Sequence, residues 1–225
     1  MPPAEDLLSL LISAKDEDGQ SMDRKQLRDE VLITFFAGHE TTANLLTWTW
    51  VMLSKNPLVR EKLHAELERV LNGRTPTLED VPNLTYTRMV LDEALRLYSP
   101  VAIMARDPLA DDEIGGFHIP AGSLVTITPY ITHRHPEFWH NPEAFDPERF
   151  TPAEVAKRPR YAYYPFGAGP RICLGQHFAL LEAVLALATV AHRFELQLVP
   201  GLGIQAEFVG TMRPNRSVLM EVQER

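Results

Sequence analysis

The sequence holds very little cysteine and nothing that resembles a secretory leader. Cys173 is the only cysteine among 225 residues, so an internal disulfide is excluded and a reducing compartment fits. The first six residues are acidic and lack an apolar core segment, which argues against a signal peptide. We therefore expect a cytoplasmic protein. The net charge of −8 argues against nucleic acid as the main partner.

Proline is scarce outside one region of the chain. Eleven of the eighteen prolines lie between Pro100 and Pro170, so this region is predicted to be rich in turns, whereas the flanks can hold long helices. The apolar fraction of 45% is ordinary for a globular protein. The length allows one domain with a sizeable core or two small ones.

One uninterrupted helical run dominates the first quarter of the chain. Ser21 or Asp23 can cap a helix that meets no breaker before Lys55, and such a helix would be about 48 Å long. Residues 31–53 are apolar enough to raise the question of a membrane span. His39 and Glu40 near its centre would be costly in lipid, so we expect a buried central helix instead.

The other elements follow from caps, breakers and periodicity. Asn56 is predicted to cap a third helix, with Pro57 at its first position and Gly73 just past its end. Residues 116–119 and 124–127 are predicted to form a hairpin around a turn at 120–122. The remaining expectations are helices at 6–14, 77–80, 84–98 and 176–192, irregular chain at 129–165, and strands at 194–199 and 218–222.

The single cysteine lies in a loop of three glycines and a proline, residues 166–175, which we call the cysteine loop. Glycines let the backbone pass close to a flat ligand. Arg171 and the start of the following helix would favour an anionic sulfur on Cys173. These features favour a metal-bound thiolate. By itself, however, a lone cysteine is more often a small buried hydrophobe, and a Gly-Pro loop is often only a turn.

Residues 37–42 form a second motif in the middle of the long helix. Gly38 removes side-chain bulk, and Glu40 places an acid beside the alcohol of Thr41, a pair that could relay protons. The alternative is that the threonines only bond back to carbonyl groups one turn earlier. The His39–Glu40 dipeptide also suggests a zinc protease, but that motif requires histidine where Ala43 stands.

Glu93 and Arg96 form a third motif, because residues three apart share one face of a helix. An exposed pair of this kind contributes little to stability. The apolar neighbours of these two residues predict burial, and a buried pair needs further partners to offset its desolvation. His133 and His135 could be metal ligands, but histidines at this spacing in strands or loops are usually packing or surface residues, so no role is assigned to them.

The cysteine loop fills all six fixed positions of the pattern Phe-Gly-x-Gly-x-Arg-x-Cys-x-Gly. It resembles the haem-ligand loop of the cytochrome P-450 haem-thiolate monooxygenases. Residues 37–42 resemble the oxygen-activation stretch of that family's central helix. Residues 147–150 (Pro-Glu-Arg-Phe) resemble the segment that adds a second arginine to the family's Glu-x-x-Arg pair. Four motifs thus occur in family order over nearly the whole chain.

The resemblance implies a mainly α fold with a small β portion. Residues 1–225 would be the C-terminal, haem-binding portion of a P-450-like domain, because the helices that precede the family's central helix are missing. The long helix would then expose an apolar face that those helices normally cover.

The resemblance also implies haem b (iron protoporphyrin IX) with Cys173 as the iron ligand. Glu40 would be the acid and Thr41 the alcohol of oxygen activation. Arg106 would bind a haem propionate through its guanidinium fork. Glu93, Arg96 and Arg149 would be a structural triad that holds the cysteine loop, not a catalytic group. The further haem contacts implied are Phe166, Gly167, Arg171, Gly175, Ala37 and Gly38.

The implied reaction inserts one atom of O2 into a small apolar substrate. The substrate would lie against Ala37, Gly38, Thr41 and residues 101–104. Electrons would come from a ferredoxin, flavodoxin or reductase-type partner, and the basic run 157–160 could help to dock it. Two alternatives remain open: a haem-binding module without turnover, and a helical interaction protein without a cofactor in which Cys173 is merely buried.

Overall fold

The computed structural model describes residues 6–225, which divide into two compact units. The first unit ends at Glu40, and the second runs from Thr41 to Arg225. The division falls inside the long helix α2 (Arg24–Lys55). The two units are therefore described separately.

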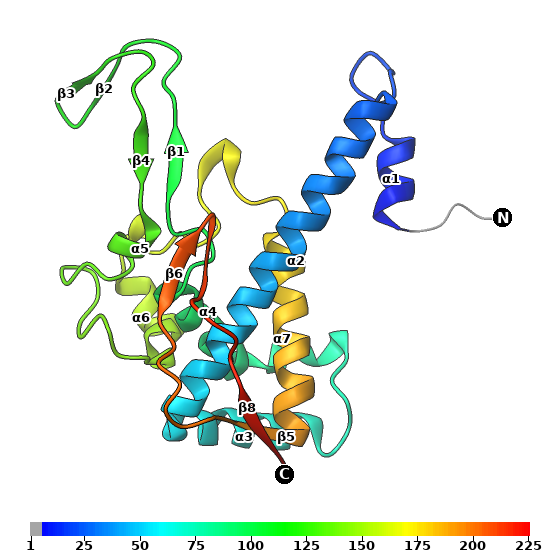
Figure 1. The fold of residues 1–225 in the computed structure, drawn as a ribbon, viewed down its shortest axis with the longest axis vertical. Coiled ribbons are helices and arrows are strands. Elements are labelled where there is room, and N and C mark those ends of the chain that lie inside the picture. Colours follow the sequence, from blue (N-terminus) through cyan, green and yellow to red (C-terminus); the bar gives the residue numbers. More distant parts are fainter. Residues whose placement is uncertain (1–5) are drawn as a thin grey trace. The chain divides into compact units, whose positions relative to one another are not determined.

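The first unit contains α1 (Leu7–Ser13) and the N-terminal part of α2 (Figure 1). Asp6 caps α1 by accepting a hydrogen bond from the Ser9 N–H at 2.7 Å, and Asp23 accepts one from the Gln26 N–H at 2.8 Å. The predicted helices at both places, including the cap at Asp23, are confirmed. The predicted burial is wrong for this part of α2, where Phe35 and Phe36 are 64% and 65% exposed. No helix of the described chain is both long and apolar enough for a membrane span.

The second unit is built on a helical core. Helices α3 (Pro57–Leu71), α4 (Thr85–Leu97) and α7 (Gln176–Arg193) contact one another, and the C-terminal part of α2 joins the same core. The 3-10 helix η1 (Leu78–Asn83) packs against α3 and α7. These elements confirm the predicted helices. The buried side chains that join them include Leu45, Leu53, Leu63, Leu67, Leu91, Val184 and Leu187.

The start of α3 differs from the predicted capping. Asn56 makes no capping hydrogen bond, because its side-chain Nδ2 donates back to the Met52 carbonyl at 2.7 Å. Pro57 is the first residue of α3, as predicted, because a proline N–H is not needed there. The helix ends at Leu71, and Asn72 takes the left-handed conformation that closes it (φ 46°).

The predicted hairpin pairs the wrong strands. Strand β3 (Phe117–Ile119) pairs with β2 (Asp112–Ile114), and β4 (Val125–Ile127) pairs with β1 (Met104–Arg106), both antiparallel. Gly115 and Gly116, both at positive φ (61° and 85°), form the tight turn between β2 and β3. Two consecutive left-handed residues match the twist of a short hairpin, so this turn sets the pairing.

The C-terminal region forms two more antiparallel pairs. Strand β5 (Phe194–Leu198) pairs with β8 (Met220–Glu224) (Figure 1). The sequence predicted a strand at each of these places, but not their pairing. Strands β6 (Ala206–Val209) and β7 (Thr211–Pro214) were not predicted. The proline-rich region holds short helical segments: α5 (Pro129–Thr132), η2 (Pro147–Phe150), α6 (Pro152–Lys157), η3 (Arg160–Ala162) and η4 (Gly169–Arg171).

Candidate functional site

The cysteine loop (166–175) is closed by its own backbone. The Cys173 N–H donates to the Phe166 carbonyl at 2.9 Å, and the Gly167 N–H donates to the Tyr164 carbonyl at 3.0 Å. Gly167 and Gly169 have φ values of 74° and 68°, which side-chain-bearing residues rarely adopt. These two glycines are therefore required by the loop itself.

The end of the loop presents its side chains to solvent. Cys173 is an exposed free thiol, and Leu174 beside it is fully exposed. Phe178, in the first turn of α7, is 69% exposed. Within the described chain, Arg171 has no hydrogen-bond or ion-pair partner. An accessible sulfur thus lies among exposed apolar side chains and beside a cation.

The glycines of the loop differ in what surrounds them. A Cβ on Gly175 would meet no atom within 4 Å, and its φ of −84° suits any residue. A Cβ on Gly167 would lie 3.4 Å from the Met104 sulfur, so β1 lies against this part of the loop. The backbone does not require glycine at position 175. A glycine at position 175 instead leaves the space beside the backbone free of a side chain.

The Glu93–Arg96 pair on α4 is fully buried and fully hydrogen-bonded. Arg96 Nε and Nη2 donate to the two carboxylate oxygens of Glu93 at 2.6 and 2.8 Å. The remaining Arg96 donors reach three backbone carbonyls, and Glu93 also accepts the Asp146 N–H at 2.9 Å. All five guanidinium donors are therefore used, as a buried pair requires. The carbonyl acceptors belong to His133, Pro142 and Ala144, at 2.7, 2.8 and 3.0 Å.

Arg149 joins this pair from η2. Its Nε lies 3.5 Å from Glu93 Oε1, within ion-pair distance but without hydrogen-bond geometry. Its Nη2 donates to the Asn141 carbonyl at 2.9 Å. Burial raises the pKa of Glu93, and the hydrogen bonds and charge of Arg96 act against that shift. The structure thus brings together the three residues of the predicted triad.

The residues of the long-helix motif fall on both sides of the division between the units. Ala37, Gly38 and Glu40 belong to the first unit and are exposed. Thr41 begins the second unit and is half-buried, and Thr42 next to it is buried, with an Oγ1 that has no hydrogen-bond partner. Burial therefore begins at the second threonine of the motif.

Arg106 lies at the exposed end of β1. Its Nη1 donates only to the carbonyl of the preceding residue, Ala105, at 2.7 Å. The rest of the guanidinium is available to an acidic group, which is what the propionate prediction needs. That contact stays a prediction.

His133, to which the sequence analysis assigns no role, is completely buried next to the site. Its ring Nε2 accepts the Tyr164 N–H at 3.0 Å, two residues before the cysteine loop. Its carbonyl accepts Arg96 Nη1. Nothing in the local pattern around His133 indicates these contacts, because both partners are more than thirty residues away.

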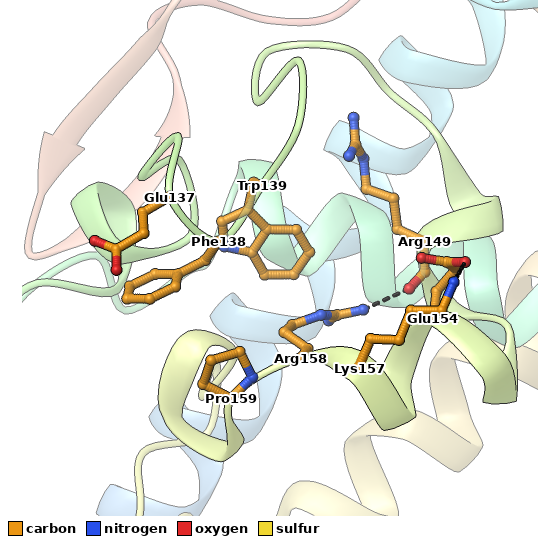
Figure 2. A pocket seen from close by; sticks show the side chains of 8 residues that line it. All are labelled: Glu137, Phe138, Trp139, Arg149, Glu154, Lys157, Arg158 and Pro159. Atoms are coloured by element: carbon orange, nitrogen blue, oxygen red, sulfur yellow. Dashed lines mark hydrogen bonds and ion pairs between the residues drawn. The ribbon is translucent and has the colours of Figure 1, made fainter.

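The basic run 157–160 is less available for docking than its composition predicts. Arg158 lies over the ring of Trp139, 4.2 Å from its centroid, and donates to the Arg149 carbonyl (Figure 2). Lys157 pairs with Glu154 at 2.6 Å. These residues line a pocket of about 280 Å³. Arg158 therefore has a structural role, and Lys157 and Arg160 are the exposed cations of the run.

The residues around Cys173 fit a haem group. The thiol is accessible, two loop glycines leave the backbone uncovered, and Arg171 and Arg106 both have free guanidinium donors for carboxylates. The exposed apolar side chains of Ile172 and Leu174 could contact a flat apolar ring. The donor set is thus a single cysteine sulfur with cationic and apolar neighbours, which suits thiolate ligation of a haem.

Comparison with known proteins supports the same family. The family model for cytochrome P450 matches residues 2–221, so the chain belongs to the cytochrome P450 family. Proteins of this family generally carry a haem cofactor.

Individual relatives agree and show how much of the family the chain spans. It is 42% identical over 201 residues to cyclooctatin synthase from Streptomyces melanosporofaciens, covering 89% of this chain and 44% of that protein. Cyclooctat-9-en-7-ol 5-monooxygenase from the same organism is 42% identical over 197 residues, 87% of this chain and 43% of that protein. The chain therefore spans less than half the length of these curated relatives.

Solved structures show the same partial match. The crystal structure of the cytochrome P450DA heme domain superposes with a TM-score of 0.91 at 37% identity. The match covers 98% of this chain and 49% of that one. The fold is thus an incomplete P450 fold, mainly α with a small β portion, as predicted.

Proposed function

We propose that residues 1–225 are the C-terminal haem-binding portion of a monooxygenase domain, with Cys173 as the thiolate ligand of haem b. The supporting observation is the cysteine loop: an accessible sulfur on a loop whose glycines take left-handed conformations and whose closing hydrogen bond joins Phe166 to Cys173. The chain that enters the loop at Tyr164 is hydrogen-bonded to the buried His133, next to the Glu93–Arg96 pair, and these contacts can hold the loop in one conformation.

When bound, a thiolate-ligated haem supplies O–O bond cleavage and transfer of one oxygen atom to a substrate. The residues of this chain would bind and orient that group. Cys173 donates the sulfur, Arg171 and Arg106 bind carboxylates, and Phe166 and Gly167 form the base of the loop. Gly175 would leave the space beside the loop free for the haem. Its φ is one that any residue can adopt, so the backbone conformation does not explain the glycine.

We assign proton delivery to Glu40 and Thr41. A carboxylate next to a hydroxyl can pass protons from solvent toward a buried reaction site. The exposure of Glu40 suits the solvent end of such a path, and the half-burial of Thr41 suits the inner end. Ala37 and Gly38 would leave room for haem and substrate.

The substrate is proposed to be a small apolar organic molecule. The stretch 101–104, next to the cysteine loop, carries the exposed apolar side chains of Val101 and Ile103. One relative is named cyclooctat-9-en-7-ol 5-monooxygenase, which assigns an organic substrate to that protein. Electrons would come from a ferredoxin, flavodoxin or reductase-type donor, and the chain's own residues would exclude water from the reacting carbon.

A second candidate function is a haem-binding module without turnover. The exposure of Ala37 and Gly38 favours it, because oxygen activation requires exclusion of bulk water from the space beside these two residues. The two candidates share the Cys173 ligand and differ only in turnover.

One experiment tests the shared element. The chain is expressed, supplied with haemin and reduced under carbon monoxide, and the difference spectrum is recorded. We expect the spectrum of a thiolate-ligated haem, and its loss in Cys173→Ser. Equal haem content and an unchanged spectrum in that variant would overturn the proposal. Consumption of NADPH-derived electrons with product formation, using a surrogate redox partner, separates the monooxygenase from the silent module.

A further inference from the structure

His133 connects two parts of the second unit by bonding in two directions. Its carbonyl accepts a hydrogen bond from Arg96 Nη1 at 2.7 Å, and its ring Nε2 accepts one from the Tyr164 N–H at 3.0 Å. The residue is fully buried. One side of His133 thus touches the Glu93–Arg96 pair and the other touches the chain that enters the cysteine loop.

The protonation state of the ring follows from its partner. An Nε2 that accepts a backbone N–H carries no proton, so the neutral ring is protonated at Nδ1. Nδ1 of His133 is buried and lacks a hydrogen-bond partner. Burial, and secondarily the charge of Arg96, lower the pKa of His133 to about 3. The ring therefore stays a neutral acceptor at ordinary pH.

The segment that His133 contacts is fixed at several atoms. The Tyr164 carbonyl accepts the Gly167 N–H at 3.0 Å, and the Tyr164 hydroxyl lies 2.8 Å from Thr132 Oγ1. The Phe166 carbonyl in turn accepts the Cys173 N–H. An unbroken path of contacts thus runs from Arg96 through His133 and Tyr164 to the base of the loop.

We propose that His133 is a positioning residue for the thiolate: its Nε2 fixes Tyr164, and thereby residues 166–173, to the buried Glu93–Arg96 pair, in the one loop geometry in which Cys173 can ligate haem iron. The inference rests on the proposed function. It adds a role that belongs to neither the ligand nor the predicted triad. Because Tyr164 donates through its backbone, only the acceptor side of this contact can be removed by a simple substitution.

The test compares two substitutions at the same place. His133→Gln puts an amide oxygen near the position of Nε2 and keeps an acceptor. His133→Leu removes the acceptor and leaves the Tyr164 N–H buried and unpaired. We expect His133→Leu to lower the ratio of thiolate-ligated to thiolate-free haem in the reduced carbon-monoxide spectrum by about tenfold, and His133→Gln to retain most of it.

His64 provides the matched control. It is also a buried histidine in the second unit, on α3, and among the described residues it makes no hydrogen bond to the cysteine loop. His64→Leu should lower the melting temperature without changing the spectral ratio. If His64→Leu and His133→Leu change the ratio equally at equal loss of melting temperature, His133 is only a stability residue and the inference is overturned.

Two further readings keep the inference testable. His133→Asn places its amide one bond short of Nε2, so it should behave like Leu rather than Gln, and it replaces Leu if that variant does not fold. If the wild-type chain gives no thiolate spectrum, the proposed function and this inference both fail. If the wild type gives the spectrum and all three His133 variants keep it, only the inference fails.

Discussion

Two regions of the second unit, the Glu93–Arg96 network and the cysteine loop, differ in whether their polar groups have hydrogen-bond partners within the chain. In the Glu93–Arg96 network, every guanidinium donor meets an acceptor supplied by the chain itself. In the cysteine loop, Arg171 has no partner among the described residues and the Cys173 thiol faces solvent. The hydrogen bonds of the first region are satisfied within the chain, whereas the second region has an exposed thiol and an exposed guanidinium that are available to a ligand.

The difference shows how the fold separates stability from chemistry. A buried ion pair is tolerated only when its remaining polar groups are satisfied, and this one collects carbonyls from three points of the proline-rich region. The network thereby fixes the irregular segment that contains His133, Pro142 and Ala144. The loop can then expose a reactive sulfur on a fixed base. Substitutions in the two regions should therefore have different consequences.

The largest effect is expected from Arg96→Leu. Removal of Arg96 leaves the Glu93 carboxylate buried without its partner, so the free energy of unfolding should fall by about 3–5 kcal/mol. Urea unfolding followed by circular dichroism measures it. Lys157→Leu is the control, because its pair with Glu154 has the same i,i+3 spacing but both side chains are exposed, and its loss should cost less than about 1 kcal/mol. Equal losses would show that burial of the network contributes nothing special.

The pH dependence of stability should be dominated by two buried histidines. Burial lowers the pKa of His133 to about 3 and, as the largest of several causes, lowers that of His64 to about 4. Both values lie below the unfolded value of 6.5, so the unfolded chain binds more protons in this range. Stability is therefore complete above pH 6.5 and falls as the pH drops toward 4, by about 1.4 kcal/mol per pH unit for each group.

Urea unfolding of the wild type and of His133→Gln at several pH values between 7 and 4 checks this expectation. The variant should lose about half of the contribution that the two histidines make to the slope, because only His64 then supplies it. An identical slope in both proteins would mean that the His133 ring is not neutral in the folded state, or that other groups control the acid sensitivity.

The glycines of the loop give a smaller and more selective effect. Gly169→Ala places a side chain at φ 68°, which should cost about 1–2 kcal/mol of stability. Gly175→Ala has an ordinary φ and open space, so the stability of the haem-free chain should not change. If haem lies against Gly175, that same variant should bind haemin more weakly in a titration. Unchanged haemin affinity would remove Gly175 from the predicted contacts.

The smallest effect on folding is expected from Cys173→Ser. The thiol is exposed and makes no structural contact through its sulfur, so the free energy of unfolding should change by less than about 0.5 kcal/mol. Its effect on haem ligation should nevertheless be complete, as described above. A large loss of stability in the haem-free variant would contradict the view that the loop exposes its sulfur.

The sequence predicted the regular elements well and the strand pairing poorly. Caps and breakers placed α1, α2, α4 and α7 because their signals are local: Asp6 and Asp23 accept backbone N–H groups three residues on. The sequence predicts a hairpin turn at Pro120 and Gly122, which would pair β3 with β4. The turn that sets the pairing is instead formed by Gly115 and Gly116, and it joins β3 to β2. Asn56 does not cap α3, because its side-chain Nδ2 donates a hydrogen bond to the Met52 carbonyl of α2 and the side chain is thereby directed away from α3.

For the candidate site, the sequence by itself determined the chemistry on offer: one thiol among glycines, an acid beside an alcohol, and a carboxylate three residues from an arginine. These are properties of residue type and short spacing, which need no knowledge of the fold. Only the tertiary structure decided which of these groups are satisfied within the chain and which face solvent. It brought Arg149 to Glu93 and His133 to Tyr164, because contacts across more than thirty residues depend on how the helices pack.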